Sequence, residues 1–135
     1  MSGLSLDANV LLALWRPEPN ALAVSRALGN FASRQRLVLS GPAYGELYGF
    51  YPNLEQQLTT LGIQVMPDMP LAAWQRAGEV HAAYSRRRRQ SGGGVPRRIL
   101  TDFLIGAHAS AYGLSLFTLN TADYADFPEV PLLTL

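Results

Sequence analysis

Short apolar segments separated by helical stretches are the sequence feature that most constrains the fold of this chain. Five such segments, each three to six residues long, are predicted to be strands, at residues 4–6, 37–39, 63–66, 116–118 and 130–135. Apolar strands that alternate with helices are typical of a mostly parallel sheet that is covered on both faces. The sequence therefore predicts an α/β fold, a three-layer α/β/α sandwich around a mostly parallel central sheet.

Helices are predicted between these strands from apolar periodicity and from residues that begin or end helices. They lie at residues 10–15, 21–33 after Asn20, 42–51 after Ser40, 54–61 before Gly62, 70–89, and 102–112 between a Thr101 cap and Gly113. Residues 91–94 form a glycine-rich loop, and residues 120–127 form a loop or a short helix. No internal repeat or linker divides the chain, so residues 1–135 are predicted to form one domain.

Composition excludes several classes of site. The chain has no cysteine, which removes thiol nucleophiles, disulfides and cysteine-based zinc sites. Its first residues lack a basic stretch and are not a secretory signal. No run of about 18 uncharged apolar residues occurs, so we expect no membrane span and a cytoplasmic protein.

Acidic residues follow several of the predicted strands. Asp7 comes directly after the first strand, Glu46 lies in the helix after the second, and Asp123 lies in the loop after the fourth. Active sites of parallel sheets lie beyond the carboxyl ends of the strands, so topology brings these acids to one edge. Asp102 opens an apolar helix, whose positive end is expected to keep this carboxylate ionised.

Each acid also has a simpler interpretation. Asp7 and Asp102 could serve only as helix caps, Glu46 could be an exposed helical residue, and Asp123 could belong to an ordinary polar loop. However, an acid within an apolar stretch is costly to bury without a partner or a metal, which favours a functional Asp7.

The two histidines do not suggest a metal site. His108 lies six residues after Asp102, about 240° around a helix, and therefore on a different face. His81 is distant in sequence from the acids, and both histidines are predicted to be packing or surface residues. No nucleophile elbow or phosphate-binding loop occurs either.

The acidic segments together resemble the PIN-domain ribonucleases, most closely the VapC-like toxins of type II toxin–antitoxin pairs. The resemblance rests on LDANVLLALW, PAYGELYGF, TDFLIGAHASAYGLSLFTLN and NTADYADFPEVPLL, in that order. It extends over nearly the whole chain, and it implies a PIN-like fold. One departure is Ala8, where the family often has threonine.

The resemblance implies a set of site residues. Asp7, Glu46 and Asp102 match the three main acids of the family, and Asp123 matches the fourth, for which Asn120 is the alternative. Asn9, Thr118 and Asn120 match supporting polar groups. Oxygen ligands favour Mg²⁺ or Mn²⁺, with Asp7 and Asp102 as the direct ligands. Glu46 and Asp123 would bind through water or a second ion.

The resemblance also implies partners. They are an RNA substrate, a cognate antitoxin that inserts a peptide near the acids, and a second copy in a homodimer. All 11 basic residues are arginine, which suits phosphate but also suits a GC-rich genome. We expect the arginine cluster to contact RNA backbone or a protein partner; the alternative is a solvated helix end. This cluster consists of Arg86, Arg87, Arg88, Arg89, Arg97 and Arg98.

Three other functions compete with a toxin. The chain could be a PIN nuclease of RNA processing that has no antitoxin, or a catalytically inactive PIN-like binding module. A phosphohydrolase with Asp7 as its nucleophile would need a second acid two residues later, and Asn9 occupies that place.

Overall fold

The computed structural model describes residues 3–94 and 99–135. Arg97 and Arg98, two members of the arginine cluster, lie outside the described residues. Within the described part of the chain, no helix is both long enough and apolar enough to cross a membrane.

A five-stranded sheet forms the centre of the molecule. Its strands are β1 (Gly3–Leu6), β2 (Arg36–Ser40), β3 (Ile63–Met66), β4 (Ser115–Phe117) and β5 (Leu132–Leu133). They are ordered β3-β2-β1-β4-β5, and every neighbouring pair is parallel. The predicted parallel sheet is thus confirmed, and the central strand β1 carries Asp7 at its carboxyl end.

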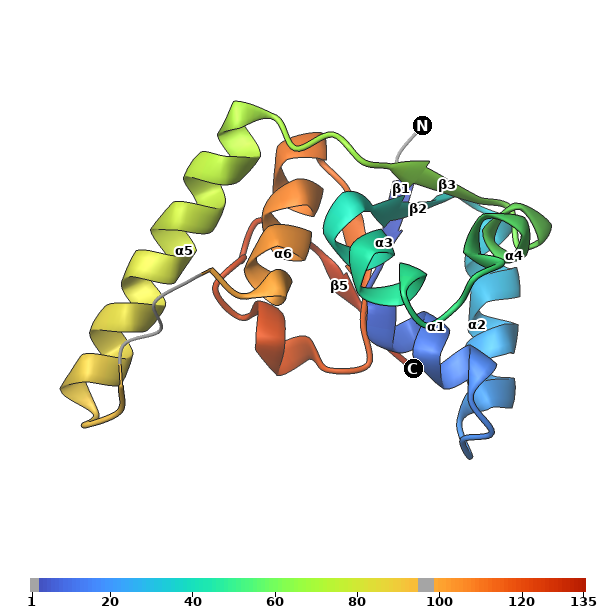
Figure 1. The fold of residues 1–135 in the computed structure, drawn as a ribbon, viewed down its shortest axis with the longest axis horizontal. Helices are drawn as coiled ribbons and strands as arrows, with labels where there is room; N and C mark the ends of the chain where they lie inside the picture. The colour runs from blue at the N-terminus through green and yellow to red at the C-terminus, as the bar shows by residue number, and fades with distance from the viewer. Residues whose placement is uncertain (1–2, 95–98) are drawn as a thin grey trace.

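Helices flank the sheet on two sides. They are α1 (Ala8–Trp15), α2 (Ala21–Ala32), α3 (Gly41–Tyr48), α4 (Leu54–Thr60), α5 (Leu71–Gln90) and α6 (Thr101–Tyr112). Helices α5 and α6 lie to one side of the strands, and α1, α2 and α4 lie to the other (Figure 1). Helix α3 contacts both α1 and α6. The layered α/β architecture predicted from the sequence is therefore present.

Helix ends and caps differ from the prediction at several places. Leu100, and not Thr101, occupies the N-cap of α6, and no side chain caps that helix. Asn20 does occupy the N-cap of α2, but its side chain makes no capping hydrogen bond. Helix α3 ends at Tyr48, with Gly49 as its C-cap, instead of continuing to Tyr51.

Strand and loop lengths also differ. Strand β5 spans only Leu132–Leu133 of the predicted strand 130–135, because its partner β4 ends at Phe117 and offers no further pairs. The segment after β4 contains a short 3-10 helix, η1 (Thr121–Tyr124). The expectation of a loop or a short helix at 120–127 is thus confirmed, and η1 carries Asp123.

A buried aromatic ring fixes the segment that follows η1. Phe127 is 1% exposed and packs against Gly106 of α6, where an added Cβ would lie 2.5 Å from the ring. Arg76 of α5 lies over the same ring at 5.3 Å from its centroid. Helices α5 and α6 therefore hold the C-terminal segment close to Asp102.

Ion pairing strengthens this attachment. The Arg76 guanidinium donates to both carboxylate oxygens of Glu129, at 2.7 and 3.0 Å, and to the main-chain oxygen of Asp126 at 2.9 Å. The Ser110 hydroxyl donates to Glu129 at 2.7 Å. These bonds lower the pKa of Glu129 to about 2. A bidentate arginine–carboxylate pair thus joins α5 and α6 to the end of the chain.

We predict that Gly106→Ala destabilises the fold. The added methyl group overlaps the Phe127 ring, and overpacking of a core costs about 1–3 kcal/mol. Chemical denaturation would measure the change. Gly78→Ala is the matched control, because nothing lies within 4 Å of a Cβ at that helical position. The control should be neutral or stabilising by up to about 1 kcal/mol. Equal stability of the two variants would contradict the packing argument.

Candidate metal centre

Asp7 lies at the carboxyl end of β1 and begins helix α1. Its main-chain N–H donates to the Phe117 oxygen at 2.9 Å, which extends the pairing of β1 with β4. Its Oδ1 accepts a hydrogen bond from the Asn9 N–H at 3.4 Å as the helix cap. The side chain is only 4% exposed. Asp7 is therefore both the cap and a buried carboxylate.

The second carboxylate oxygen of Asp7 accepts two short hydrogen bonds. The Tyr124 hydroxyl donates to Oδ2 at 2.8 Å, and the Thr118 hydroxyl donates at 2.9 Å. Thr118 reaches Asp7 because Leu6 is paired with Phe117 in the sheet. Burial, followed by the charge of Asp7, raises the pKa of Tyr124 well above its usual value, so the phenol stays a donor.

Tyr124 is a site residue that the sequence analysis missed. The only available signal was its position directly after Asp123, in a polar turn where most side chains face solvent. Tyr124 instead is 1% exposed, and its hydroxyl points at an acid 117 residues away in the chain.

The supporting polar residues form a network around Thr118. Asn9 donates to the Thr118 hydroxyl at 3.5 Å and accepts from the Leu119 N–H at 3.3 Å. The Asn120 main-chain N–H donates to Thr118 at 3.0 Å. Asn9 and Thr118 thus contact the site through their side chains, whereas Asn120 does so through its backbone.

Asp102 and Asp123 line the same cavity, which has a volume of about 430 Å³. Asp102 is half-buried in the first turn of α6, and Asp123 is exposed in η1. Tyr84 and Arg87 of α5 line the cavity as well. The cavity therefore brings two of the acids together with one residue of the arginine cluster.

The acids are close enough to perturb one another. Burial, and then the charges of Asp123, Asp7 and Glu46 in that order, raise the pKa of Asp102 to about 6. Burial and then the charge of Asp7 raise the pKa of Glu46, which lies on α3 and is largely exposed. The positive end of α6 was expected to lower the pKa of Asp102, but burial and the neighbouring acids shift this pKa in the opposite direction.

The donor set suits a hard divalent cation. All four groups are carboxylates, and within residues 3–94 and 99–135 no arginine forms an ion pair with any of them. As the side chains stand, however, no three Asp, Glu or His residues of the described chain are arranged to hold one ion together. The chemistry thus fits Mg²⁺ or Mn²⁺, while the structure gives no ligand geometry.

The described part of the arginine cluster is exposed at the end of α5. Arg87 forms an ion pair with Asp126 at 2.7 Å, and Arg88 donates to the Gly94 oxygen at 2.8 Å. The guanidinium groups of Arg87 and Arg88 each lie 5.9 Å from the centre of the Tyr84 ring. Of the four cluster members that the structure describes, only Arg87 lines the cavity with the acids.

His108 packs in the interior, as expected. It is fully buried, and its Nε2 lies 2.9 Å from the Met66 oxygen. Burial lowers the pKa of His108, which keeps the ring neutral. His81 lies beside the Phe103 ring, with centroids 6.4 Å apart.

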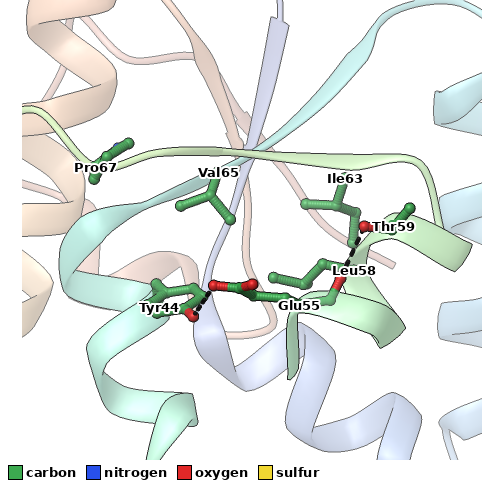
Figure 2. Close-up of a pocket in the computed structure, with 7 residues that line it drawn as sticks. All are labelled: Tyr44, Glu55, Leu58, Thr59, Ile63, Val65 and Pro67. Carbon is green, nitrogen blue, oxygen red and sulfur yellow. Dashed lines mark hydrogen bonds between the residues drawn. The ribbon is translucent and has the colours of Figure 1, made fainter. Parts of the chain in front are cut away.

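A second cavity of about 440 Å³ lies between α3, α4 and β3 (Figure 2). None of the four site acids lines it. Its one acid, Glu55, accepts a hydrogen bond from the Tyr44 hydroxyl at 3.1 Å. Mostly apolar side chains, among them Leu58, Ile63 and Val65, form the rest of its lining. This cavity is therefore separate from the carboxylate site.

Solved structures share this fold. The VapBC2 structure from Rickettsia felis, bound to a promoter DNA fragment, aligns with a TM-score of 0.68 and 20% identity, covering 98% of each chain. DNA-bound VapBC from Salmonella typhimurium aligns with a TM-score of 0.65 and 21% identity, covering 99% of this chain and 98% of that one. FitAcB from Neisseria gonorrhoeae aligns with a TM-score of 0.62 and 20% identity, covering 96% of each chain.

At these identities the solved structures establish the fold alone. Among curated proteins, none matches the sequence significantly. The family model of the PIN domain, in contrast, matches residues 4–130, which is nearly the whole chain. The chain therefore belongs to the PIN domain family.

Proposed function

We propose that this protein is a Mg²⁺-dependent endoribonuclease and the toxin of a toxin–antitoxin pair. One observation carries the proposal. In this PIN domain chain, burial and then the charges of Asp123, Asp7 and Glu46 raise the pKa of Asp102, which supports a common site for the four acids. No arginine in the described residues compensates these charges.

A divalent cation would relieve this repulsion. Asp7 and Asp102 would bind it directly, and Glu46 and Asp123 would bind through water or a second ion. Bound Mg²⁺ would activate a water molecule and stabilise the charge that develops on the phosphoryl oxygens. The chain's own contribution is to hold the carboxylates in place and, through Asn9 and Thr118, to fix the loop after β4 against Asp7.

Arg87 would attract the substrate. Its guanidinium lines the cavity that also contains Asp102 and Asp123, and a planar fork suits an RNA phosphate. The ion pair with Asp126 fixes this guanidinium beside the acids. Arg86, Arg88 and Arg89 extend the positive charge along the same helix end, with Arg97 and Arg98 as further members of the cluster.

The toxin assignment and the partners rest on the fold neighbours. These neighbours include VapBC and FitAcB assemblies and a toxin–antitoxin complex from Klebsiella pneumoniae. By this likeness we propose a cognate antitoxin for this chain, and from the resemblance to VapC-like toxins we propose a homodimer as its assembly. A size measurement and co-purification with the product of a neighbouring gene would test both.

We predict that Asp7→Asn abolishes RNA cleavage while the protein stays folded. The amide oxygen can still accept from Tyr124 and Thr118, but it carries no charge for a cation. The loss should exceed the about 10- to 100-fold that removal of an outer-shell partner costs. Cleavage of a labelled RNA pool would be measured with Mg²⁺, with EDTA, and after Mg²⁺ is restored.

Asp68→Asn is the control, because Asp68 is exposed and lines neither cavity. Wild type and the control should cleave the RNA when Mg²⁺ is present and not in EDTA, and both should arrest growth when expressed. Full cleavage in EDTA would refute the metal. Growth arrest by Asp7→Asn would refute the assignment of toxicity to this site.

The pH dependence of folding should change in Asp102→Asn. The folded-state pKa of Asp102, about 6, lies above its ordinary value of 3.8. Between these values the folded state binds more protons than the unfolded state, so stability falls as pH rises. Without metal, the variant should therefore gain stability over wild type at pH 7.5 and lose that gain by pH 4. Thermal unfolding in EDTA would measure the stability of both proteins. An equal difference between variant and wild type at pH 7.5 and at pH 4 would contradict the pKa shift.

We predict that the double variant Arg87→Gln, Arg88→Gln weakens RNA binding and reduces its salt dependence. Each phosphate contact to single-stranded RNA contributes roughly 0.7 to the slope of log affinity against log salt, so two lost contacts remove about 1.4. Binding would be titrated in the non-cleaving Asp7→Asn background. Arg26→Gln, an exposed arginine of α2, is the control. An unchanged slope of log affinity against log salt would show that Arg87 and Arg88 do not contact the RNA backbone.

A further inference from the structure

Tyr124 is a buried polar residue among the candidate ligands. It ends η1, is 1% exposed, and donates its hydroxyl to Oδ2 of Asp7 at 2.8 Å. Its neighbour Phe127 is buried as well, and the Phe127 N–H donates to the Tyr124 oxygen at 3.0 Å. The ring is therefore fixed by packing, and this packing does not require the hydroxyl group.

The two oxygens of Asp7 have unequal partners. Oδ2 accepts from Tyr124 at 2.8 Å and from Thr118 at 2.9 Å. Each carboxylate oxygen has about two lone-pair sites, so two short hydrogen bonds occupy Oδ2. Among the described residues, Oδ1 accepts only the long bond from the Asn9 N–H, at 3.4 Å. Oδ1 thus keeps lone-pair density that hydrogen bonds do not use.

We propose that Tyr124 is a positioning residue for the metal site: with Thr118 it occupies Oδ2 of Asp7, so that Asp7 presents Oδ1 alone to a cation. The inference rests on the proposed metal-dependent function. Without the phenol, the carboxylate can rotate about its terminal bond and offer either oxygen. Fixing one oxygen in advance reduces the conformational freedom that is lost when the ion binds.

The contacts of Tyr124 favour this role over simple packing. A core that needed only the ring would be served equally by phenylalanine, without the cost of burying a hydroxyl. The hydroxyl instead meets the most buried of the four acids and crosses from η1 to the end of β1. The orientation of the first ligand is thereby tied to the turn that carries Asp123.

The test is Mn²⁺ binding by Tyr124→Phe, which removes one oxygen atom. Calorimetric titration of the metal-free protein with Mn²⁺ should give a Kd raised about tenfold or more, in the range expected for loss of an outer-shell partner. In RNA cleavage, the Mn²⁺ concentration for half-maximal rate should rise similarly. The rate at saturating Mn²⁺ should approach that of wild type.

Tyr44→Phe is the matched control. It removes a hydroxyl that donates to a carboxylate, Glu55, in the cavity of Figure 2, away from the site acids. Its Mn²⁺ affinity should equal that of wild type. Thr118→Val removes the second donor to Oδ2 and should raise the Kd in the same direction. If Tyr124→Phe unfolds at a clearly lower temperature than the control, the Mn²⁺ affinity of Thr118→Val tests the positioning role instead.

Four outcomes are distinguishable. A raised Kd in Tyr124→Phe or Thr118→Val, with an unchanged control, supports the positioning role. Wild-type affinity in the folded variants overturns that role and leaves the proposed nuclease standing. If the wild-type protein itself fails to bind Mn²⁺, the metal-dependent function falls, and the role of Tyr124 falls with it. A lower rate at saturating Mn²⁺ with an unmoved half-maximal concentration would also overturn it, because that result marks a structural role.

Discussion

The burial of the Asp7 carboxylate is the constraint on which the site depends. At 4% exposure, an ionised group without partners would cost several kcal/mol. The chain meets this cost with donors from three elements: the first turn of α1, the end of β4, and η1. Two of the donors lie 111 and 117 residues away in sequence. The parallel register that pairs Leu6 with Phe117 is therefore also what assembles the site.

The acids of this chain differ in whether an arginine neutralises them. Glu129 is matched by Arg76 and Ser110, which lower its pKa to about 2. Asp102 has no arginine partner in the described chain, and its pKa rises to about 6. Arg87 lies beside the same cavity but pairs with Asp126 instead. Acids that secure the fold are thus paired, and acids of the candidate site keep their charge available for a cation.

Much of this arrangement is encoded locally and could be predicted. Apolar periodicity gave the order of strands and helices, and parallel topology predicted that Asp7 and Asp123 follow strands at one edge. Tyr124 could not be predicted, because a tyrosine in the polar turn TADY carries no sign that it is buried. The cap of α6 was misassigned, since Thr101 looks like a cap in sequence while the backbone places Leu100 there. The pKa of Asp102 depends on burial and on neighbours from other elements, which a local pattern does not contain.

The position of the site acids is set by packing at some distance from them. Asp126 is held twice by α5: Arg76 binds its main-chain oxygen and Arg87 its carboxylate. Phe127 fills the space that Gly106 leaves on α6. Both contacts immobilise the residues directly after η1, and η1 carries Asp123 together with the phenol that holds Asp7. Helix α5 thereby joins two features that sequence alone leaves separate, the carboxylate cavity and the arginine cluster at its end. A change in how α5 packs on α6 would move the acids and the cluster together.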